Sequence, residues 1–482
     1  MVKSSAETAG ERTPRVLLFY PNIDSNWERI RTGDDLHRPS SGLQYVMAIL
    51  KRHGYGFGFI DQVIEEKNHH DVLTEIEKQG FEIVGIHANV LTRYGVCRLI
   101  QKIKAQTAAK VMIGGPGAIE PRPYVEAGAD AVLIGEAEGR LIELIEALHR
   151  GKPLGDLAGL CFRDQNGEVI VTPPAPPIED LDQLPFPHRI PQLARYYGEP
   201  MNPLQKGIYT AIIASRGCPF DCTFCSSHLV WGKRVRWRSV DNVLAEMTAA
   251  RQEWPDTYFS FLDDTFGPNI GWVREFCEKL AAKKWSNLWG CILHPSSFGS
   301  QRAEILSLMA KAGCRVISYG AQSASPDILV NIHRQPKEPE MLADALAICR
   351  QNGILTIVTY IYGLPGETHQ TMAANLDFVL RHRPNLADFH PLYIIPKTRI
   401  AEEYPDGKVT ALTEEQIEQA CAKAFRTFYS RPGVIWNLFR LTLKNNPRYF
   451  LKGFIALKML IRQMRQAKDR RTGKALRAPE KF

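Results

Sequence analysis

The chain has 482 residues, of which 44% are hydrophobic, with ten cysteines and a formal net charge of +8. No run reaches the eighteen apolar residues of a membrane-spanning helix, and the cysteines lack the even framework of a disulfide-rich secreted domain. These properties argue against an integral membrane protein and a disulfide-stapled one. We expect a cytoplasmic protein with reduced thiols and two or three domains.

The first third of the chain alternates apolar runs with segments of helical spacing. Residues 1–13 are polar and predicted to be disordered. Strands are expected at RVLLFYPN, GFGFID, FEIVGIHAN, KVMIGGPG and AVLIGE, with helices between them. This alternation predicts an α/β domain over residues 14–150, with a doubly wound parallel sheet.

Glycines follow two of these strands, where ligands bind in such sheets. Gly114 and Gly115 follow one strand, and Gly135 and Glu136 follow another. Close packing of helix on strand is a second explanation for the glycines. The four residues are therefore candidate cofactor contacts only.

The next segment, residues 151–208, is rich in proline and is predicted to be a linker between domains. Within it, LCFRDQNGEVIVT carries Asn166–Gly167, a pair typical of tight hairpin turns. We expect a short β-hairpin there.

Three cysteines stand close together in SRGCPFDCTFCSS: Cys218, Cys222 and Cys225, at C-x3-C-x2-C spacing. A cubane iron–sulfur cluster normally takes four cysteine ligands, so three would leave one iron open to bind and reduce a small molecule. Zinc is the competing metal, but no second C-x2-C or H-x3-H pair lies within the next thirty residues. The spacing favours a cluster with an open iron.

With Phe224 at its aromatic place, the motif resembles the signature of radical S-adenosylmethionine (SAM) enzymes. The resemblance implies that a 4Fe–4S cluster binds SAM through its amino and carboxyl groups. It also implies reductive cleavage of SAM to methionine and a hydrogen-abstracting 5′-deoxyadenosyl radical. An external electron donor such as flavodoxin or ferredoxin would supply the electron.

The strand-then-helix order resumes after residue 208. Strands are expected at YTAIIAS, YFSFLDD, LWGCILHP, RVISYGAQS, ILTIVTYIYG and ADFHPLYIIP. Six such units predict a (β/α)6 partial barrel over residues 209–400, the fold that radical SAM enzymes share. Chemistry in such barrels takes place at the carboxyl ends of the strands.

Polar residues follow the predicted barrel strands. Asp263 and Asp264 either cap the next helix or, by resemblance, receive the amino group of SAM. Gln322 and Ser323 belong to YGAQS, which resembles the family's GIES element with an amide in place of the acid. The amide can still hydrogen-bond a ribose hydroxyl.

Three later positions also match family elements. Arg334 either reaches the SAM carboxylate or lies on the surface with its stem packed. Gly363, in IYGLPGET, resembles the GLPGE element and would let the backbone approach adenine, whereas Glu367 there is interpreted as the start of a helix. Residues 396–398, Pro-Lys-Thr, replace a PGT-type turn.

The remaining cysteines are interpreted as small apolar core residues. Cys291 and His294, near the end of the third barrel strand, are the exceptions to be tested.

The GGP and GEAE elements resemble the cobalamin-binding domain that precedes the radical SAM domain in one large subfamily. The older D-x-H-x-x-G motif is lost, because Val63 and Glu66 stand where its histidine and glycine would be after Asp61. The resemblance nevertheless implies bound cobalamin, although a few members keep the fold without the cofactor.

Residues 401–482 are predicted to form a helical, basic extension. Its last 42 residues hold twelve Lys or Arg and two acids, interleaved with aromatic residues. Such a segment either contacts an anionic membrane surface peripherally or covers the barrel bottom. A nucleic-acid partner is not expected, because transfer-RNA methylthiotransferases of the radical SAM class carry three further cysteines in a different N-terminal domain.

The resemblance to this subfamily spans residues 14–400. The subfamily includes methylases of unactivated carbon and the anaerobic magnesium-protoporphyrin cyclase. We therefore expect methyl transfer from cobalamin to a carbon of a small-molecule or lipid-like substrate. Two further hypotheses are a radical cyclase, oxidase or dehydratase without methyl transfer, and a catalytically silent iron–sulfur redox or scaffold protein. Substrate-dependent formation of S-adenosylhomocysteine would distinguish the methylase from the radical enzymes without methyl transfer.

Overall fold

The computed structural model describes residues 13–21, 40–62, 64–65, 67–190 and 209–445. The chain divides into two compact units. Unit 1 comprises residues 1–196 and 229–231, and unit 2 comprises residues 197–228 and 232–482. Val63, Glu66, the end of the proline-rich segment and the basic tail beyond residue 445 lie outside the described residues.

Unit 1 contains a seven-stranded sheet of order β2-β1-β3-β4-β5-β6-β7, and its first five strands are parallel. The strands are β1 Val16–Tyr20, β2 Phe57–Asp61, β3 Ile83–His87, β4 Lys110–Gly114, β5 Ala131–Leu133, β6 Leu160–Arg163 and β7 Val169–Val171. The helices are α1 Ser41–Arg52, α2 His69–Gln79, α3 Arg93–Gln106, α4 Arg122–Glu126 and α5 Leu141–Arg150. The predicted order of strands and helices is confirmed.

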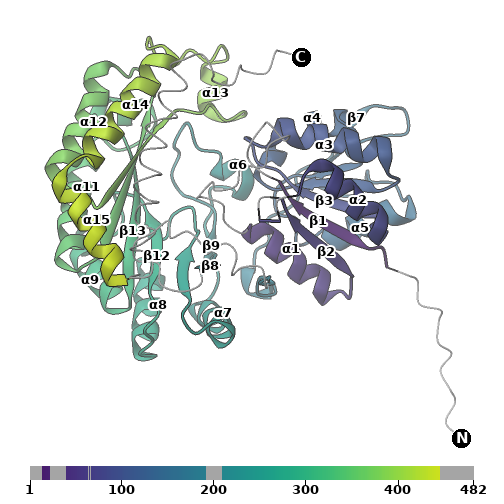
Figure 1. Cartoon of the computed structure of the whole chain (residues 1–482), viewed down its shortest axis with the longest axis horizontal. Helices are drawn as coiled ribbons and strands as arrows, with labels where there is room; N and C mark the ends of the chain where they lie inside the picture. The colour runs from purple at the N-terminus through teal and green to yellow at the C-terminus, as the bar shows by residue number, and fades with distance from the viewer. Residues whose placement is uncertain (1–12, 22–39, 63, 66, 191–208, 446–482) are drawn as a thin grey trace, which may run out of the picture. The chain divides into compact units, whose positions relative to one another are not determined.

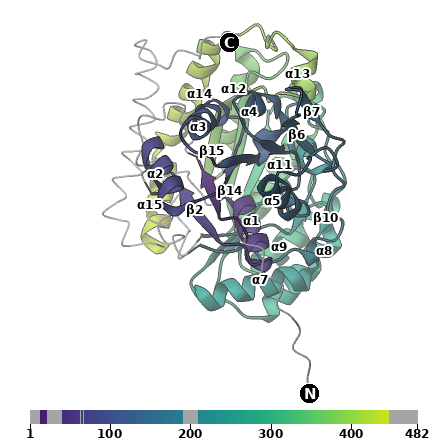
Figure 2. The same ribbon diagram turned by 90° about the vertical axis from the view of Figure 1, so that its right-hand side faces the viewer.

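Helices cover both faces of this sheet. On one face α2, α3 and α4 pack on β-strand residues such as Phe19, Ile86 and Ile113. On the other, α1 lies beside α5 (Figure 2). Burial on both faces explains why the parallel strands read as continuous apolar runs.

The predicted hairpin is present as β6 and β7, paired antiparallel. Gly167 adopts φ 88°, and Asp164 Oδ1 accepts from the backbone N–H of Asn166 and Glu168 at 2.9 and 2.8 Å. β6 also pairs antiparallel with β5. The hairpin therefore extends the unit 1 sheet beyond residue 150, into the segment that the sequence assigned to a linker carrying a hairpin.

Unit 2 contains a parallel six-stranded sheet of order β15-β14-β13-β12-β11-β8. Its strands are β8 Tyr209–Ile212, β11 Tyr258–Phe261, β12 Trp289–Leu293, β13 Cys314–Gln322, β14 Leu355–Tyr362 and β15 Leu386–Pro391. A separate two-stranded ribbon joins β9 Ser215–Arg216 to β10 Arg236–Trp237. All six predicted barrel strands are confirmed.

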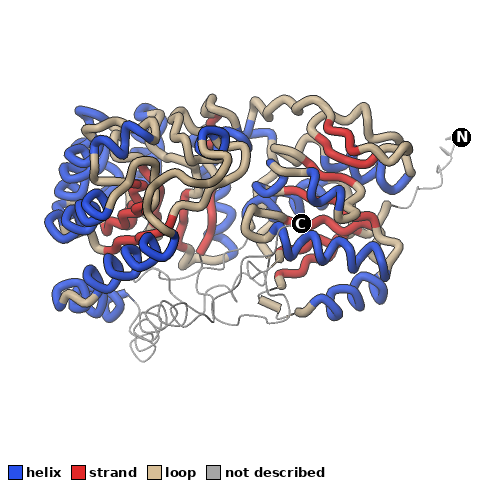
Figure 3. Tube along the Cα trace, turned by 90° about the horizontal axis from the view of Figure 1, so that it is seen from above, coloured by secondary structure: helices blue, strands red, loops and turns tan. Residues whose placement is uncertain are grey.

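Helices line one side of this sheet, as Figure 1 shows for α9, α11, α12 and α14 and as the blue helices beside the red strands show in Figure 3. The helices of unit 2 are α7 Val240–Glu253, α8 Ile270–Ala282, α9 Arg302–Lys311, α10 Pro326–Asn331, α11 Glu338–Gln351, α12 His369–His382, α13 Arg399–Glu403, α14 Glu414–Tyr429 and α15 Pro432–Asn445. The short helix α6 Ser227–Trp231 has its last three residues in unit 1. Strand residues alternate between two faces. Val358, Tyr360 and Tyr362 of β14 belong to the core under the helices, whereas Thr359 and Ile361 are only partly buried. The opposite, concave face is therefore the more open one.

The two ends of that concave face differ. At the amino ends of the strands, Tyr209, Tyr258 and Val316 form a small buried cluster that fills it. At the carboxyl ends, loops and polar residues follow the strands. The polar groups available for chemistry accordingly lie at the carboxyl ends.

The C-terminal helix α14 packs on the edge strand β15. The Tyr429 hydroxyl accepts from the Ala387 N–H at 3.2 Å and donates to the Ala387 carbonyl at 3.1 Å. This occupies backbone groups that an open sheet edge leaves unpaired. None of the described helices is both long and apolar enough to cross a membrane.

Candidate active site

The cysteine loop, residues 217–226, follows β8 and β9 at the carboxyl end of the unit 2 sheet. Gly217 begins it with φ 99°, and a Cβ there would lie 2.4 Å from the Arg234 carbonyl oxygen. Only glycine fits that close approach without strain. The sequence thus turns the chain sharply just before Cys218.

Two sets of contacts fix the loop. The Thr223 N–H donates to the Ile332 carbonyl at 3.3 Å, and the Thr223 carbonyl accepts from the Ile400 N–H at 3.0 Å. The Asp221 carboxylate pairs with Lys233 and with Arg399, whose Nη2 lies at 3.1 Å, and it also contacts His333. The hydrogen bonds from Lys233 and His333 and the charge of Arg399 lower the pKa of Asp221 to about 2.

The three cysteines are partly buried and free of disulfides. Burial raises the pKa of Cys218 to about 12 and that of Cys222 to about 11, and it also raises the pKa of Cys225. Asp264 adds to this for Cys218 and Cys225, whereas Arg334 opposes it at Cys222. Thiolates at these positions therefore require a compensating cation such as cluster iron.

Three free thiols on one loop are the ligand type of an iron–sulfur cluster. Among the described residues, no three His, Cys, Asp or Glu side chains converge closely enough to hold one metal ion. Tetrahedral zinc requires such convergence, whereas in a cubane each cysteine binds its own iron.

The two acids after β11 have different environments. Asp263 is buried, accepts from the Ser215 hydroxyl at 2.6 Å and has a pKa raised by burial to about 7. Asp264 is exposed by its surface area, and partial desolvation by the surrounding loops raises its pKa. Asp263 therefore ties β11 to the start of the cysteine loop, and Asp264 is the acid available to a ligand.

The end of β13 is irregular. Gln322 adopts φ 64° next to a break in the pairing of β13 with β14, and its Oε1 is buried without a hydrogen-bond partner in the described structure. A strained residue with an unpaired buried oxygen is a candidate ligand contact.

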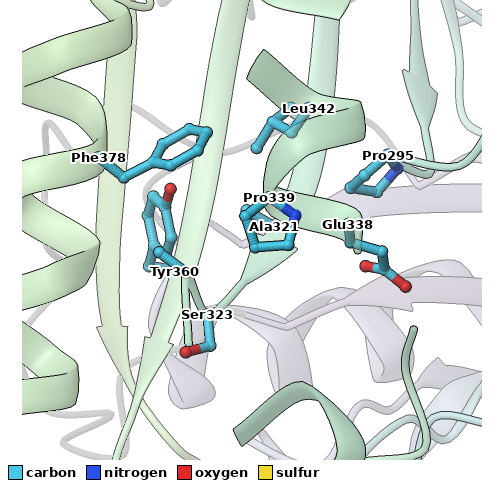
Figure 4. Close-up of a pocket in the computed structure, with 9 residues that line it drawn as sticks. Pro295, Ala321, Ser323, Glu338, Pro339, Leu342, Tyr360 and Phe378 are labelled. Atoms are coloured by element: carbon cyan, nitrogen blue, oxygen red, sulfur yellow. The ribbon is translucent and has the colours of Figure 1, made fainter. Parts of the chain in front are cut away.

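Ser323 turns toward the helices instead. Its hydroxyl donates to Asn375 Oδ1 at 3.4 Å and accepts from the Ser325 N–H at 3.1 Å. It lines a narrow pocket between β13, β14, α11 and α12 that also includes Glu338, Tyr360 and Phe378 (Figure 4). That pocket leaves no room for a water-sized molecule, so it is not a substrate site.

Arg334 is buried and does not lie on the surface. Its guanidinium donates to Glu338 through Nε at 2.8 Å and through Nη2, and Nη2 also donates to the Gly320 carbonyl at 2.9 Å. Glu338 lies 3.5 Å from His294 Nε2, and the His294 ring stacks on Phe220 of the cysteine loop with 3.7 Å between centroids. The structure thus brings His294 to the loop, while Cys291 lies in the core.

The GLPGE segment is shaped by its own glutamate. Gly363 adopts φ 90°, and the buried Glu367 carboxylate accepts from the N–H groups of Gly363 and Leu364. Glu367 thus braces this turn, which is more than the helix start that the sequence predicted. Lys397 adopts φ 62°, so the Pro-Lys-Thr turn keeps a left-handed residue at its centre.

The strand ends of unit 1 carry no comparable charge cluster among the described residues. A Cβ on Gly115 would lie 2.7 Å from the Ala88 carbonyl oxygen, and one on Gly117 would lie 2.7 Å from Tyr124 Oη. Internal packing therefore accounts for these two glycines. Gly114 differs, because nothing lies within 4 Å of its Cβ position.

Two buried polar atoms beside these glycines lack a hydrogen-bond partner in the described structure: His87 Nδ1 and Tyr124 Oη. Burial lowers the pKa of His87 to about 4, so its ring is neutral. Gly135 adopts φ 81° after β5, and the Glu136 carboxylate accepts from the Ile178 N–H at 3.1 Å. The open space at Gly114 and the unpaired atoms fit a bound cofactor at this edge.

The sequence matches two families, in the order that the two units suggest. Residues 33–145 match the B12 binding domain, and residues 212–379 match the Radical SAM superfamily. The chain belongs to the cobalamin-binding-domain radical SAM family. As a radical SAM enzyme of this family, it uses a 4Fe–4S cluster, SAM and cobalamin.

Two relatives are similar to this chain over most of its length. It is 29% identical over 452 residues to the uncharacterized methyltransferase PH0819 of Pyrococcus horikoshii, covering 87% of this chain and 94% of the relative. It is 27% identical over 389 residues to the anaerobic magnesium-protoporphyrin IX monomethyl ester cyclase of Rubrivivax gelatinosus, covering 78% and 67%.

Its fold resembles that of the radical SAM methyltransferase TsrM from Kitasatospora setae, with a TM-score of 0.67 at 22% identity. The likeness covers 82% of this chain and 76% of TsrM. At 22% identity, this likeness shows that the two proteins share a fold.

Proposed function

We propose that this radical SAM enzyme generates a 5′-deoxyadenosyl radical and methylates a carbon of a small-molecule or lipid-like substrate. The observation that carries the proposal is the cysteine loop at the carboxyl end of the unit 2 sheet, where Asp264 and Arg334 shift the pKa values of the thiols in opposite directions. This loop occurs in one chain with a B12-binding unit, and that combination supports methyl transfer.

Three thiolates, Cys218, Cys222 and Cys225, would hold the cluster and leave one iron for SAM. A bound cluster supplies the low-potential electron that cleaves SAM, and cobalamin supplies a transferable methyl group. Asp264 would accept the amino group of SAM, since a carboxylate pairs well with a cation. Gly363 and Gln322 would approach its adenosyl part.

The unit 1 residues assigned to cobalamin are Gly114, Gly115, Gly135 and Glu136. Of these, Gly114 would meet the cofactor directly, because its Cβ side is open. Gly115 would act by holding the turn, since its φ of 98° and its contact with Ala88 require glycine.

The second candidate is a radical cyclase that does not transfer a methyl group. The similarity to the magnesium-protoporphyrin cyclase over 78% of this chain favours a cyclase over an oxidase, a dehydratase or a silent redox protein. Methylase and cyclase would both consume SAM to form 5′-deoxyadenosine. Only methyl transfer converts a second SAM to S-adenosylhomocysteine.

The experiment is an anaerobic incubation of the reconstituted enzyme with SAM, a reductant and candidate substrates, followed by quantification of both nucleosides. We expect substrate-dependent 5′-deoxyadenosine and S-adenosylhomocysteine in equal amounts. Substrate-dependent 5′-deoxyadenosine alone would favour the cyclase. A bound cluster that never cleaves SAM would leave the silent redox or scaffold role.

We further propose two partners, an external one-electron donor such as flavodoxin or ferredoxin and an anionic membrane surface. Helix α15 exposes Ile435, Trp436, Phe439 and Leu443, and the basic segment follows it in the sequence. Exposed aromatic and basic residues support interfacial binding. Removal of residues 446–482 should reduce binding to anionic liposomes, and unchanged binding would contradict the membrane proposal.

A further inference from the structure

Next to the cysteine loop lies a buried polar network that the three-cysteine motif does not include. It consists of Arg334, Glu338 and His294, all less than one tenth exposed. Glu338 is its centre, because one carboxylate oxygen receives the Arg334 guanidinium and the other receives the Gln335 N–H at 3.0 Å and faces His294. A carboxylate this deeply buried is stable only when it is paired in this way.

The network contacts the cysteine loop at two points. At one, the neutral His294 ring, whose pKa burial lowers to about 2, stacks nearly parallel on Phe220, with 12° between the ring planes. At the other, the Arg334 guanidinium lies close enough to Cys222 to lower the pKa of its thiol, against the larger effect of burial. Phe220 lies between Cys218 and Cys222, so both contacts act on one stretch of the loop.

The donors of Arg334 are largely committed. Its Nε donates a hydrogen bond to Glu338, and its Nη2 donates to Glu338 and to the Gly320 carbonyl. Its side chain is 3% exposed. A guanidinium held by a fixed fork of acceptors cannot swing out to a ligand without leaving Glu338 unpaired.

Resting on the proposed function, we propose that Arg334 is a positioning residue for the cluster, held by Glu338, and not the group that binds the SAM carboxylate. It donates to the Cys222 thiolate while His294 supports the loop through Phe220. Hydrogen bonds to the ligating sulfurs and nearby positive charge stabilise the reduced, more negative cluster. Loss of this donor should therefore make the cluster potential more negative.

The test compares two double variants that each remove a buried arginine–glutamate pair without leaving a lone charge. The test variant is Arg334→Gln with Glu338→Gln. The control is Arg238→Gln with Glu246→Gln, a pair with side chains 4% and 0% exposed that makes no described contact with the cysteines. Iron content, the midpoint potential by EPR-monitored titration, and kcat and KM for SAM cleavage are measured for both and for wild type.

We expect the test variant to keep its iron, to shift the midpoint potential to a more negative value and to lower kcat, with KM for SAM changed less than about twofold. The control should keep the wild-type potential. A KM for SAM raised by about tenfold or more, at an unchanged potential, would overturn the inference and assign Arg334 to the SAM carboxylate.

If the test variant does not fold, Arg334→Lys takes its place, because lysine keeps the charge but loses the planar fork. The midpoint potential and the KM for SAM then distinguish the two roles of Arg334 as described for the double variant. A wild-type protein that assembles no cluster would refute the proposed function itself. A wild-type cluster whose potential the variants leave unchanged would refute only the role of Arg334.

Discussion

The two sheets of this protein present their carboxyl ends in different ways. In unit 2, the strand ends carry cysteines and buried charged groups, with Asp263, Arg334 and Glu367 each fixed by named hydrogen bonds. In unit 1, the corresponding edge is built mainly from glycines and neutral groups such as His87, with Asp61 and Glu136 as separate acids. The difference suggests that unit 2 controls charge and electrons, whereas unit 1 offers a surface shaped by its backbone.

The largest expected effect tests the charged edge. Cys222→Ala should abolish cluster assembly and 5′-deoxyadenosine formation, because two thiolates do not retain a cubane that needs three or four. Cys97→Ala is the matched control, since Cys97 is also a partly buried free cysteine but lies on α3 of unit 1. Iron content, determined anaerobically, and the amount of 5′-deoxyadenosine are measured for both variants. SAM cleavage retained by the Cys222 variant would show that the chemistry of unit 2 does not depend on this cysteine.

The backbone-shaped edge is tested by two adjacent glycines. Gly115→Ala should destabilise unit 1 by roughly 1–3 kcal/mol, because φ is 98° and the new Cβ would meet the Ala88 carbonyl oxygen. Gly114→Ala should leave stability unchanged but weaken cobalamin binding by about tenfold, since its Cβ would enter open space. Denaturant unfolding and corrinoid absorbance after gel filtration measure the two effects. Wild-type cobalamin binding by the Gly114 variant would exclude direct contact there.

A pH-dependent effect is expected at Glu367. Burial raises its pKa from 4.5 to about 7 in the folded protein. The folded state therefore binds the proton more tightly, so this group's contribution to stability is complete below pH 4.5 and is lost as the pH rises toward 7. Relative to Glu367→Gln, which stays neutral, wild type should lose roughly 2–3 kcal/mol of unfolding free energy between about pH 5 and pH 8. Parallel pH profiles of the two proteins would contradict the buried, protonatable carboxyl.

The smallest effect concerns the open edge of the unit 2 sheet. Tyr429→Phe removes the hydroxyl that pairs both backbone groups of Ala387, and should cost roughly 1–2 kcal/mol. Tyr393→Phe is the control, because Tyr393 is half exposed. Equal unfolding free energies for the two variants would mean that water replaces the hydroxyl at this edge.

The sequence predicted the strands well, because buried parallel strands are short apolar runs that helices separate. It also predicted the hairpin at Asn166–Gly167, since that turn needs a positive φ. It did not predict that the hairpin would join the sheet of unit 1, because register between distant strands leaves no local pattern.

The cysteines were found from spacing alone, whereas the groups around them were not. Phe220, Asp221 and Glu338 look like ordinary loop and helix residues, and only the fold brings Glu338 to Arg334 and Phe220 to His294. The sequence also could not tell which of Asp263 and Asp264 is buried. Adjacent residues of a strand point to opposite faces, and the sequence does not show which face each one takes where the strand ends.

We propose that three thiolates hold a cluster with one iron open to SAM. The most direct test is EPR of the anaerobically reconstituted, reduced protein, recorded with and without SAM and paired with metal analysis. We predict about four irons per chain and a cluster spectrum that changes when SAM is added. Zinc in place of iron, or a spectrum that SAM leaves unchanged, would contradict the account.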